Sequence, residues 1–284
     1  MQNVLEFEKP RTGFNWKNVA IVTSFHLLAI PVLWTFSWPN LAALLIGNWI
    51  VGSLGVGLGW HRLLTHRSFK APKWIEYITS IFATMSMQDP PDKWIATHRM
   101  HHAFTDTEKD PHSIRPGFWW AQIGWVIWGT AQDHDAATMK KYVPDLLKDR
   151  GHVLISKYFY LPIIISAVIL FAIGGWTMVI WGVFGRVVFG WHTTWFVNSL
   201  AHIYGKRPND TGDLSTNNWF VAILTFGEGW HNNHHMWPTS ARHGTEWYQF
   251  DMNWITIRLL ERLGWAKDIK LAAGTSPIEL KQAA

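Results

Sequence analysis

Two long stretches of this chain carry no charged side chain. The first runs from Asn18 to Trp60, 43 residues without an Asp, Glu, Lys or Arg, and the second fills the 28 positions between Lys157 and Arg186. A membrane crossing needs roughly 20 apolar residues of helix, so each stretch is longer than one crossing. The pattern therefore predicts two pairs of membrane-spanning helices, each pair joined by a tight turn.

Turn-forming residues indicate where each pair divides. The first pair is expected to turn between Ser37 and Asn40, around Pro39. The second pair passes Gly174-Gly175 and continues beyond Arg186, which is expected near the junction of its two helices. The four expected spans cover residues of about 18–37, 40–60, 159–181 and 183–204.

The Lys and Arg residues next to these spans predict their orientation, because cytoplasmic loops carry the excess of positive charge. Lys17 precedes the first span, Arg62 and Arg67 follow the second, and Lys206 and Arg207 follow the fourth. Both termini should therefore face the cytoplasm. The expected fold is an all-α integral membrane protein, a single domain over residues 1–284, with four transmembrane helices and a cytosolic helical cap formed by residues 61–157 and 206–284.

Histidine placement brings in the chemistry. Fifteen histidines are present, and the pattern His-x-x-His-His occurs twice, although scattered histidines would give it only about 0.04 times. We call each such motif a histidine box. On an α-helix the three rings of a box lie within about 100° of arc, so they point in the same direction. The clustered residues are His61 and His66; His98, His101 and His102; His231, His234 and His235; and Asn198 with His202.

His61 and His66 follow a different spacing from the other boxes. Residues five apart diverge by about 140° on an α-helix, which suits either a helix end or ligands of two different metals. Both alternatives stay open from the sequence.

The number of imidazoles indicates the type of metal centre. A closed structural zinc site needs four ligands, whereas eight or nine imidazoles and an amide match two ions with open positions. Imidazole suits zinc, copper, iron and nickel alike, but two irons can take up two electrons and activate oxygen, which two zincs cannot. The chain has no cysteine and so no iron–sulfur cluster of its own, and its electrons must come from another protein.

Several further residues are candidates for roles around the centre. Asp106, Asp110 and Glu228 are expected to orient the imidazoles, whereas Glu108 is interpreted as part of a solvated loop. His192 is a candidate hydrogen-bond partner inside the membrane. His26, His112, His134, His152 and His243 have weaker claims. The net charge of +5 reflects cytoplasmic loops or a basic face for an acidic partner or head group.

The sequence around these histidine motifs resembles that of the membrane-bound fatty acyl desaturases, of the type that includes stearoyl-CoA desaturases and bacterial acyl-lipid relatives. The matching stretches are residues 59–69, 98–113, 197–202 and 227–235, and the resemblance extends from the first span to about residue 263. It implies oxygen-dependent insertion of a cis double bond, at the ninth carbon of a saturated long acyl chain, with O2 as co-substrate.

The resemblance also implies a ligand set, a cofactor and partners. Two iron ions, cycling between Fe2+ and Fe3+, would be held by His61, His66, His98, His101, His102, His202, His231, His234 and His235, with Asn198 acting through a water. The chain lacks a His-Pro-Gly-Gly haem motif, so a separate electron donor of the ferredoxin or cytochrome b5 type is expected. The implied location is a membrane, with the bacterial inner membrane favoured over the endoplasmic reticulum.

One departure from the family pattern concerns the substrate carrier. Members that use coenzyme A thioesters carry an Arg-Asp pair just before the second box, where this chain has Ala96-Thr97. Acyl-CoA, acyl-carrier and acyl-lipid substrates all stay open. The competing functions are a related di-iron hydroxylase or ketolase and, less favoured, a metal-binding or transport protein. No nucleic-acid partner is expected.

Overall fold

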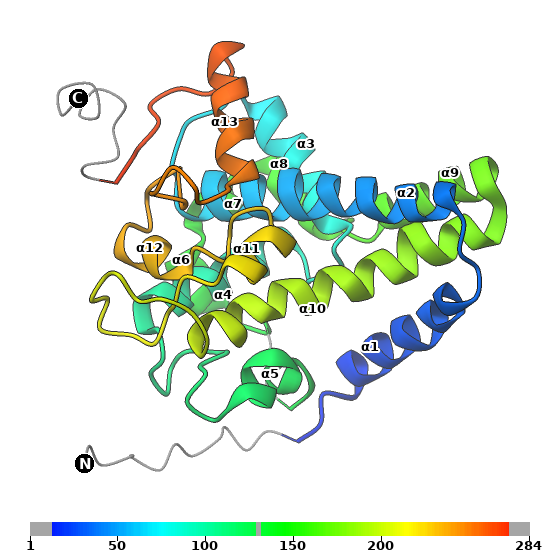
Figure 1. Ribbon diagram of the computed structural model, residues 1–284, viewed down its shortest axis with the longest axis horizontal. Helices are drawn as coiled ribbons and strands as arrows, with labels where there is room; N and C mark the ends of the chain where they lie inside the picture. Colours follow the sequence, from blue (N-terminus) through cyan, green and yellow to red (C-terminus); the bar gives the residue numbers. More distant parts are fainter. Residues whose placement is uncertain (1–12, 129–131, 273–284) are drawn as a thin grey trace.

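The computed structural model describes residues 13–128 and 132–272. Within these ranges the chain is all-helical and forms no strand beyond isolated bridges. Figure 1 shows long helices that extend side by side toward one end of the molecule and short helices gathered around the other end. This arrangement confirms the expected helical class. The termini, for which a cytoplasmic position was predicted, lie outside the described residues.

The first charge-free stretch forms a helical hairpin. Its elements are α1 (Trp16–Ala29), η1 (Ile30–Leu33), α2 (Trp38–Asn48) and η2 (Trp49–Thr65). Ser37 ends the turn, because its Oγ accepts a hydrogen bond from the backbone N–H of Asn40 and so caps α2. The turn therefore lies a few residues earlier than expected, and Pro39 belongs to the first turn of α2, where a missing N–H costs nothing.

The second charge-free stretch reverses direction at a different place from the one predicted. Its elements are α9 (Leu161–Val179), η4 (Ile180–Gly185), α10 (Arg186–Asn198) and η5 (Leu200–His202). Helical geometry is interrupted at Gly174 and Gly175, and Gly175 has a φ of 66°, which a residue with a Cβ rarely adopts. The predicted division between residues 181 and 183 was wrong, since the chain is helical there.

Arg186 consequently does not lie at a junction. It begins α10 with a side chain only 3% exposed, and its guanidinium donates to the backbone carbonyls of Gly182 and Met85. Within the described part of the chain, three helices are long and apolar enough to cross a membrane: Trp16–Leu33, Trp38–Thr65 and Leu161–His202. The third is 42 residues long and contains the glycine reversal.

Short helices between and after the two hairpins pack around the C-terminal part of η2. The first set is α3 (Lys73–Thr84), α4 (Pro91–Phe104), η3 (Trp120–Gly124), α5 (Trp125–Ile127), α6 (Ala136–Tyr142), α7 (Pro144–Lys148) and α8 (Arg150–Lys157). The second set is α11 (Trp219–Leu224), α12 (His231–Met236) and α13 (Met252–Arg262). Trp60 of η2 is fully buried, packed in one cluster with Ile95 of α4 and Val143.

Small residues in η2 allow this close packing. A Cβ on Gly55 would lie 2.5 Å from the backbone of Ala83 in α3, and one on Gly59 would lie 2.7 Å from Thr79. Helix packing therefore explains these two glycines. Gly57 is packed as closely, since a Cβ there would lie 2.3 Å from the Asn253 amide, and Gly52 and Gly57 also line a cavity described below.

Candidate metal centre

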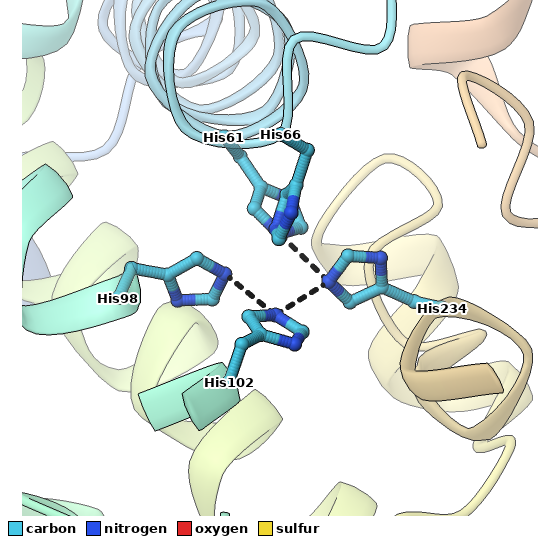
Figure 2. Close-up of side chains that lie close together, drawn as sticks. All are labelled: His61, His66, His98, His102 and His234. Carbon is cyan, nitrogen blue, oxygen red and sulfur yellow. Dashed lines mark hydrogen bonds between the residues drawn. The ribbon is translucent and has the colours of Figure 1, made fainter. Parts of the chain in front are cut away.

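The nine clustered histidines come together as two groups of buried and partly buried residues. The first group contains His61, His66, His98, His102 and His234, and the second contains His101, His202, His231 and His235. Within each group the candidate ligand nitrogens all lie within 4.8 Å of one another. Figure 2 shows the first group, in which the rings of His98, His102 and His234 turn toward those of His61 and His66.

The winding of η2 places His61 and His66 in the same group. The backbone N–H of His66 donates to the carbonyl of His61 at 3.1 Å, a bond spanning five residues in place of the four of an α-helix. Residues five apart then lie nearly on the same face, and the two ring centroids are 4.8 Å apart. The 140° divergence expected for an α-helix was therefore wrong, and the helix-end alternative agrees with this geometry.

The two His-x-x-His-His boxes contribute to both groups. On α4, His98 and His102 enter the first group and His101 enters the second; on α12, His234 enters the first, with His231 and His235 in the second. The rings of each box do share one face, as predicted. Because that face lies against the boundary between the groups, α4 and α12 each contribute ligands to both.

Contacts between imidazole nitrogens indicate that cations belong in these groups. In the first, Nε2 of His234 lies 3.1 Å from Nε2 of His61 and 2.9 Å from Nε2 of His102. In the second, Nε2 of His231 lies 3.0 Å from Nε2 of His202. Lone pairs that face each other at this distance repel unless a proton or a metal ion lies between them. The donor set is therefore suited to metal binding.

Burial keeps three rings of the first group neutral, which metal binding requires. Removal from water lowers the pKa of His98, His102 and His234 well below the ordinary imidazole value, and neighbouring imidazoles lower it further. A metal ion therefore meets little competition from protons at neutral pH. Among the described residues, Nε2 of His66 is buried without a hydrogen-bond partner, as expected for a nitrogen arranged to face a metal ion.

Four carboxylates hold the opposite nitrogen of four of these rings. Nδ1 of His61 contacts Glu228, that of His101 contacts Asp110, that of His202 contacts Asp106 and that of His235 contacts Asp213, at 2.5, 2.9, 3.2 and 2.8 Å. Such a bond fixes the tautomer and leaves Nε2 free for a metal. The three acids selected from the sequence thus lie against imidazoles, whereas Glu108 is exposed, as expected for a loop.

Asp213 was not found from the sequence. It lies in an irregular segment between η5 and α11, where no helical spacing links it to a histidine box. Its carboxylate also accepts a bond from the backbone N–H of Ser215, which holds it in place beside His235. The only sequence signal is an Asp shortly after the last membrane helix.

Two other histidines, which were weaker candidates for a role at the metal centre, adjoin the two histidine groups. His243 is 1% exposed, with Nδ1 3.2 Å from Glu228 and its ring 4.3 Å from that of His234. The ring of His112 is 4.4 Å from that of His101, and burial lowers its pKa to about 3. Both therefore surround the candidate ligands as neutral rings.

His192 and Asn198, both on α10, have different surroundings. Nε2 of His192 lies 3.0 Å from Nε2 of His26, and Nδ1 lies 3.3 Å from the amide of Gln122. Among the described residues none of these partners is one of the nine histidines, so His192 belongs to a separate polar chain. Asn198 lies at the opposite end of α10, where it lines two cavities together with His98.

These two cavities meet beside the first histidine group. The first has about 950 Å³ of empty space and extends from His98 past Trp125 to Lys17, and the second has about 800 Å³ and extends to Arg186. Most of the exposed surface in both cavities is apolar, although polar side chains also line them. The residues common to both are Gln88, Trp94, His98, Thr194 and Asn198.

Comparison with known proteins identifies the family. The model of the fatty acid desaturase family matches residues 19–264. The chain is 45% identical, over 262 residues, to the sn-1 stearoyl-lipid 9-desaturase of Anabaena variabilis, a match that covers 91% of this chain and 94% of that protein. The chain belongs to the fatty acid desaturase family.

The names of other relatives of the desaturase refer to different substrates. It is 44% identical to the sn-2 palmitoyl-lipid 9-desaturase of Nostoc sp. (strain 36), with 89% of this chain and 90% of that protein covered. It is 43% identical to an acyl-CoA 5-desaturase of Anemone leveillei, with 89% and 79% covered. The resemblance inferred from the histidine boxes is thereby confirmed. The desaturase is an oxidoreductase of fatty acyl chains in a metal-dependent membrane family.

Proposed function

We propose that the desaturase inserts a cis double bond at the ninth carbon of a saturated, lipid-linked acyl chain. Two relatives of more than 40% identity, which match about nine-tenths of this chain, are named as lipid 9-desaturases. The single observation that carries the proposal is the position of the histidine groups, which adjoin the junction of two apolar cavities. An acyl chain passing through that junction would present one of its C–C bonds to the metals.

The junction is suited to hold a chain in one register. The indole N–H of Trp94 donates to Gln88 at 3.2 Å, and the Gln88 amide donates to Thr194 at 3.2 Å. The indole ring also stacks on His98 with centroids 5.2 Å apart. An alkyl chain has no group that can form a hydrogen bond. Its position therefore depends on the shape of this junction and on the length of the cavities on either side.

The overall reaction removes two hydrogens from neighbouring methylenes. One alkane segment, one O2, two electrons and two protons yield one alkene and two waters. Two iron ions held by the nine histidines, with Asn198 beside them, would supply the oxygen activation and the electron acceptance. Glu228, Asp110, Asp106 and Asp213 would orient the rings, and the buried surroundings would exclude water from the reacting carbons.

The lining of the first cavity favours a lipid-linked substrate. Lys17 is the one Lys or Arg that lines it within the described residues, and Asp89 lies there as well. A coenzyme A carrier has several phosphates, which proteins usually bind with clustered Arg and Lys. Ala96 and Thr97, where thioester-using relatives are expected to carry an Arg-Asp pair, are buried in α4. Neither carries a charge that could pair with a phosphate, and the hydroxyl of Thr97, which lines the first cavity, already bonds to the Lys93 carbonyl and lies 2.7 Å from His134.

We further propose four membrane crossings, with the cap and both termini on the cytoplasmic side of a bacterial inner membrane. The glycine reversal supports two crossings in the 42-residue helix, and neither turn of the two hairpins carries a Lys or Arg. Electrons would come from a separate carrier of the ferredoxin or cytochrome b5 type, because the chain has no cysteine for a cluster of its own.

Expression in a bacterium without desaturase activity tests the proposal. Gas chromatography of membrane fatty acids, with location of the double bond by mass spectrometry, should reveal a new 9-monoene in intact glycerolipids. Hydroxy acids in its place would indicate the related hydroxylase chemistry. An unchanged fatty-acid profile, with iron and an electron donor supplied, would contradict the proposed function.

A further inference from the structure

A third large hollow lies on the side of α12 that faces away from the two cavities. We call it the aromatic groove, and its aromatic lining consists of Tyr204, Trp219, Trp230, Trp237, Tyr248 and Phe250. It has about 2010 Å³ of empty space, counted to its open mouth. Trp219 is 66% exposed and Tyr248 is 62% exposed, so large aromatic side chains at the groove are uncovered in the isolated chain.

The floor of the aromatic groove is directly connected to the metal centre. Trp230 precedes His231 in the chain and Asn233 precedes His234, so one peptide bond separates each groove residue from a candidate ligand. The Asn233 amide donates to the backbone carbonyl of His243 at 2.9 Å and to the hydroxyl of Thr245 at 3.0 Å. The floor is therefore held rigidly at a short covalent distance from both histidine groups.

Three cations lie in or beside the groove without a carboxylate partner among the described residues. Lys206 lines the groove, while Arg207 and Arg242 donate to the backbone carbonyls of Asp213 and Glu246. Within the described residues, none of these three cations forms an ion pair with a carboxylate. Within the lining Glu246 balances Lys206, and the positive charge at the rim comes from Arg207 and Arg242, which lie beside the lining.

A fourth hollow, between α3 and α7, differs in how its cations are paired. Its lining holds four cations and four acids, and three of the cations are paired. Arg67 pairs with Asp145 at 2.7 Å and Lys70 pairs with Asp268 at 2.7 Å, whereas Lys270 forms no ion pair among the described residues. Lys73 likewise contacts two carboxylates. It therefore offers little charge to an incoming protein and has no exposed Trp or Tyr in its lining.

We propose that the aromatic groove is the docking site of a small acidic one-electron carrier protein. This inference rests on the proposed function, which requires two external electrons per double bond. Exposed Trp and Tyr with adjacent Arg are the residues that dominate protein–protein binding energy. Positive charge at the rim would steer an acidic partner and raise its association rate. Two reduced carriers would each lose one electron per turnover.

Charge reversal in the iron-loaded full chain, reconstituted in nanodiscs, tests the proposal. Turnover is measured with reduced plant-type [2Fe–2S] ferredoxin, with reduced cytochrome b5 and with dithionite plus a small mediator. The Lys206→Glu/Arg242→Glu variant should lower the ratio of ferredoxin-supported to dithionite-supported product at least tenfold, through a higher KM for ferredoxin. Lys140→Glu, a charge reversal on exposed α6, is the matched control.

The aromatic contribution is tested with a photo-crosslinking amino acid at Tyr248, which should form an adduct with ferredoxin or cytochrome b5. An adduct with lipid only would assign the groove to the bilayer and overturn the proposal. An unchanged ratio in the double variant, or equal losses with all three reductants, would also overturn it. Failure of the unmodified chain to form product with dithionite would instead contradict the proposed function on which the inference rests.

Discussion

Glu228 Oε2 lies 2.5 Å from Nδ1 of His61, while Oε1 of the same carboxylate lies 2.9 Å from the Arg62 guanidinium. Asn253 also donates to Oε1, at 2.6 Å. One carboxylate therefore fixes the tautomer of a candidate ligand and is itself held by two donors. Loss of its charge should disturb the first histidine group more than the second.

The first prediction concerns this carboxylate. Glu228→Gln keeps the shape but weakens the acceptor facing His61, and loss of such an orienting partner typically lowers metal affinity or activity 10–100-fold. We expect iron content, measured by mass spectrometry, to fall together with monoene formation. Glu108→Gln, an exposed change in the cap, should alter neither quantity; a comparable loss there would contradict the assignment.

The second prediction concerns Asp213, whose carboxylate accepts from Nδ1 of His235 at 2.8 Å. Asp213→Asn should weaken the second histidine group and lower activity by about the same 10–100-fold. Iron per chain should approach one in place of two. Asp210→Asn changes an exposed acid in the same segment and is the control. Full iron content and activity in Asp213→Asn would refute the role of this residue.

The third prediction is that metal removal destabilises the protein. A ligand present at about a thousand times its Kd stabilises the folded state by about 4 kcal/mol, and the apo form leaves buried imidazole lone pairs facing each other. Chelation should therefore lower Tm by on the order of 10 °C, with recovery on addition of Fe2+. Differential scanning fluorimetry in detergent measures the shift, and an identical Tm with and without iron would count against a metal centre.

The fourth prediction concerns chain length. Gly190 lines the second cavity eight residues before Asn198, about 12 Å along α10. A Cβ there would lie 3.6 Å from Asn48 Oδ1, an ordinary contact, so Gly190→Ala should fold normally while filling part of the cavity. One methyl group in an apolar pocket changes selectivity by roughly 10-fold or more.

The expected result for Gly190→Ala is a lower ratio of stearoyl to palmitoyl product, read by gas chromatography. Val188→Ile adds the same mass to α10 at a position outside the cavity lining and should leave the ratio unchanged. An equal shift in both variants would indicate a general effect on the helix, and no shift in Gly190→Ala would argue against an acyl chain in this cavity.

The sequence was sufficient for the helical class, for which nine histidines cluster and for three of the four carboxylates that contact them, because long apolar runs and the spacing i, i+3, i+4 indicate α-helices directly. It was insufficient where the backbone departs from an ideal α-helix. The five-residue turn at His61 and His66 and the reversal at Gly174-Gly175 both depend on tertiary packing. Asp213 reaches His235 across an irregular segment, and no periodic pattern could indicate that contact.

The shared placement of α4 and α12 has a consequence for assembly. Each helix carries rings of both groups, so an ion bound in the first group would already fix the backbone that presents His101, His231 and His235 to the second. The conformational entropy that α4 and α12 lose when the first ion binds is not lost again when the second ion binds. We expect iron uptake to be cooperative, with half-loaded chains scarce in native mass spectra at substoichiometric iron, and a statistical mixture would show that the two groups fill independently.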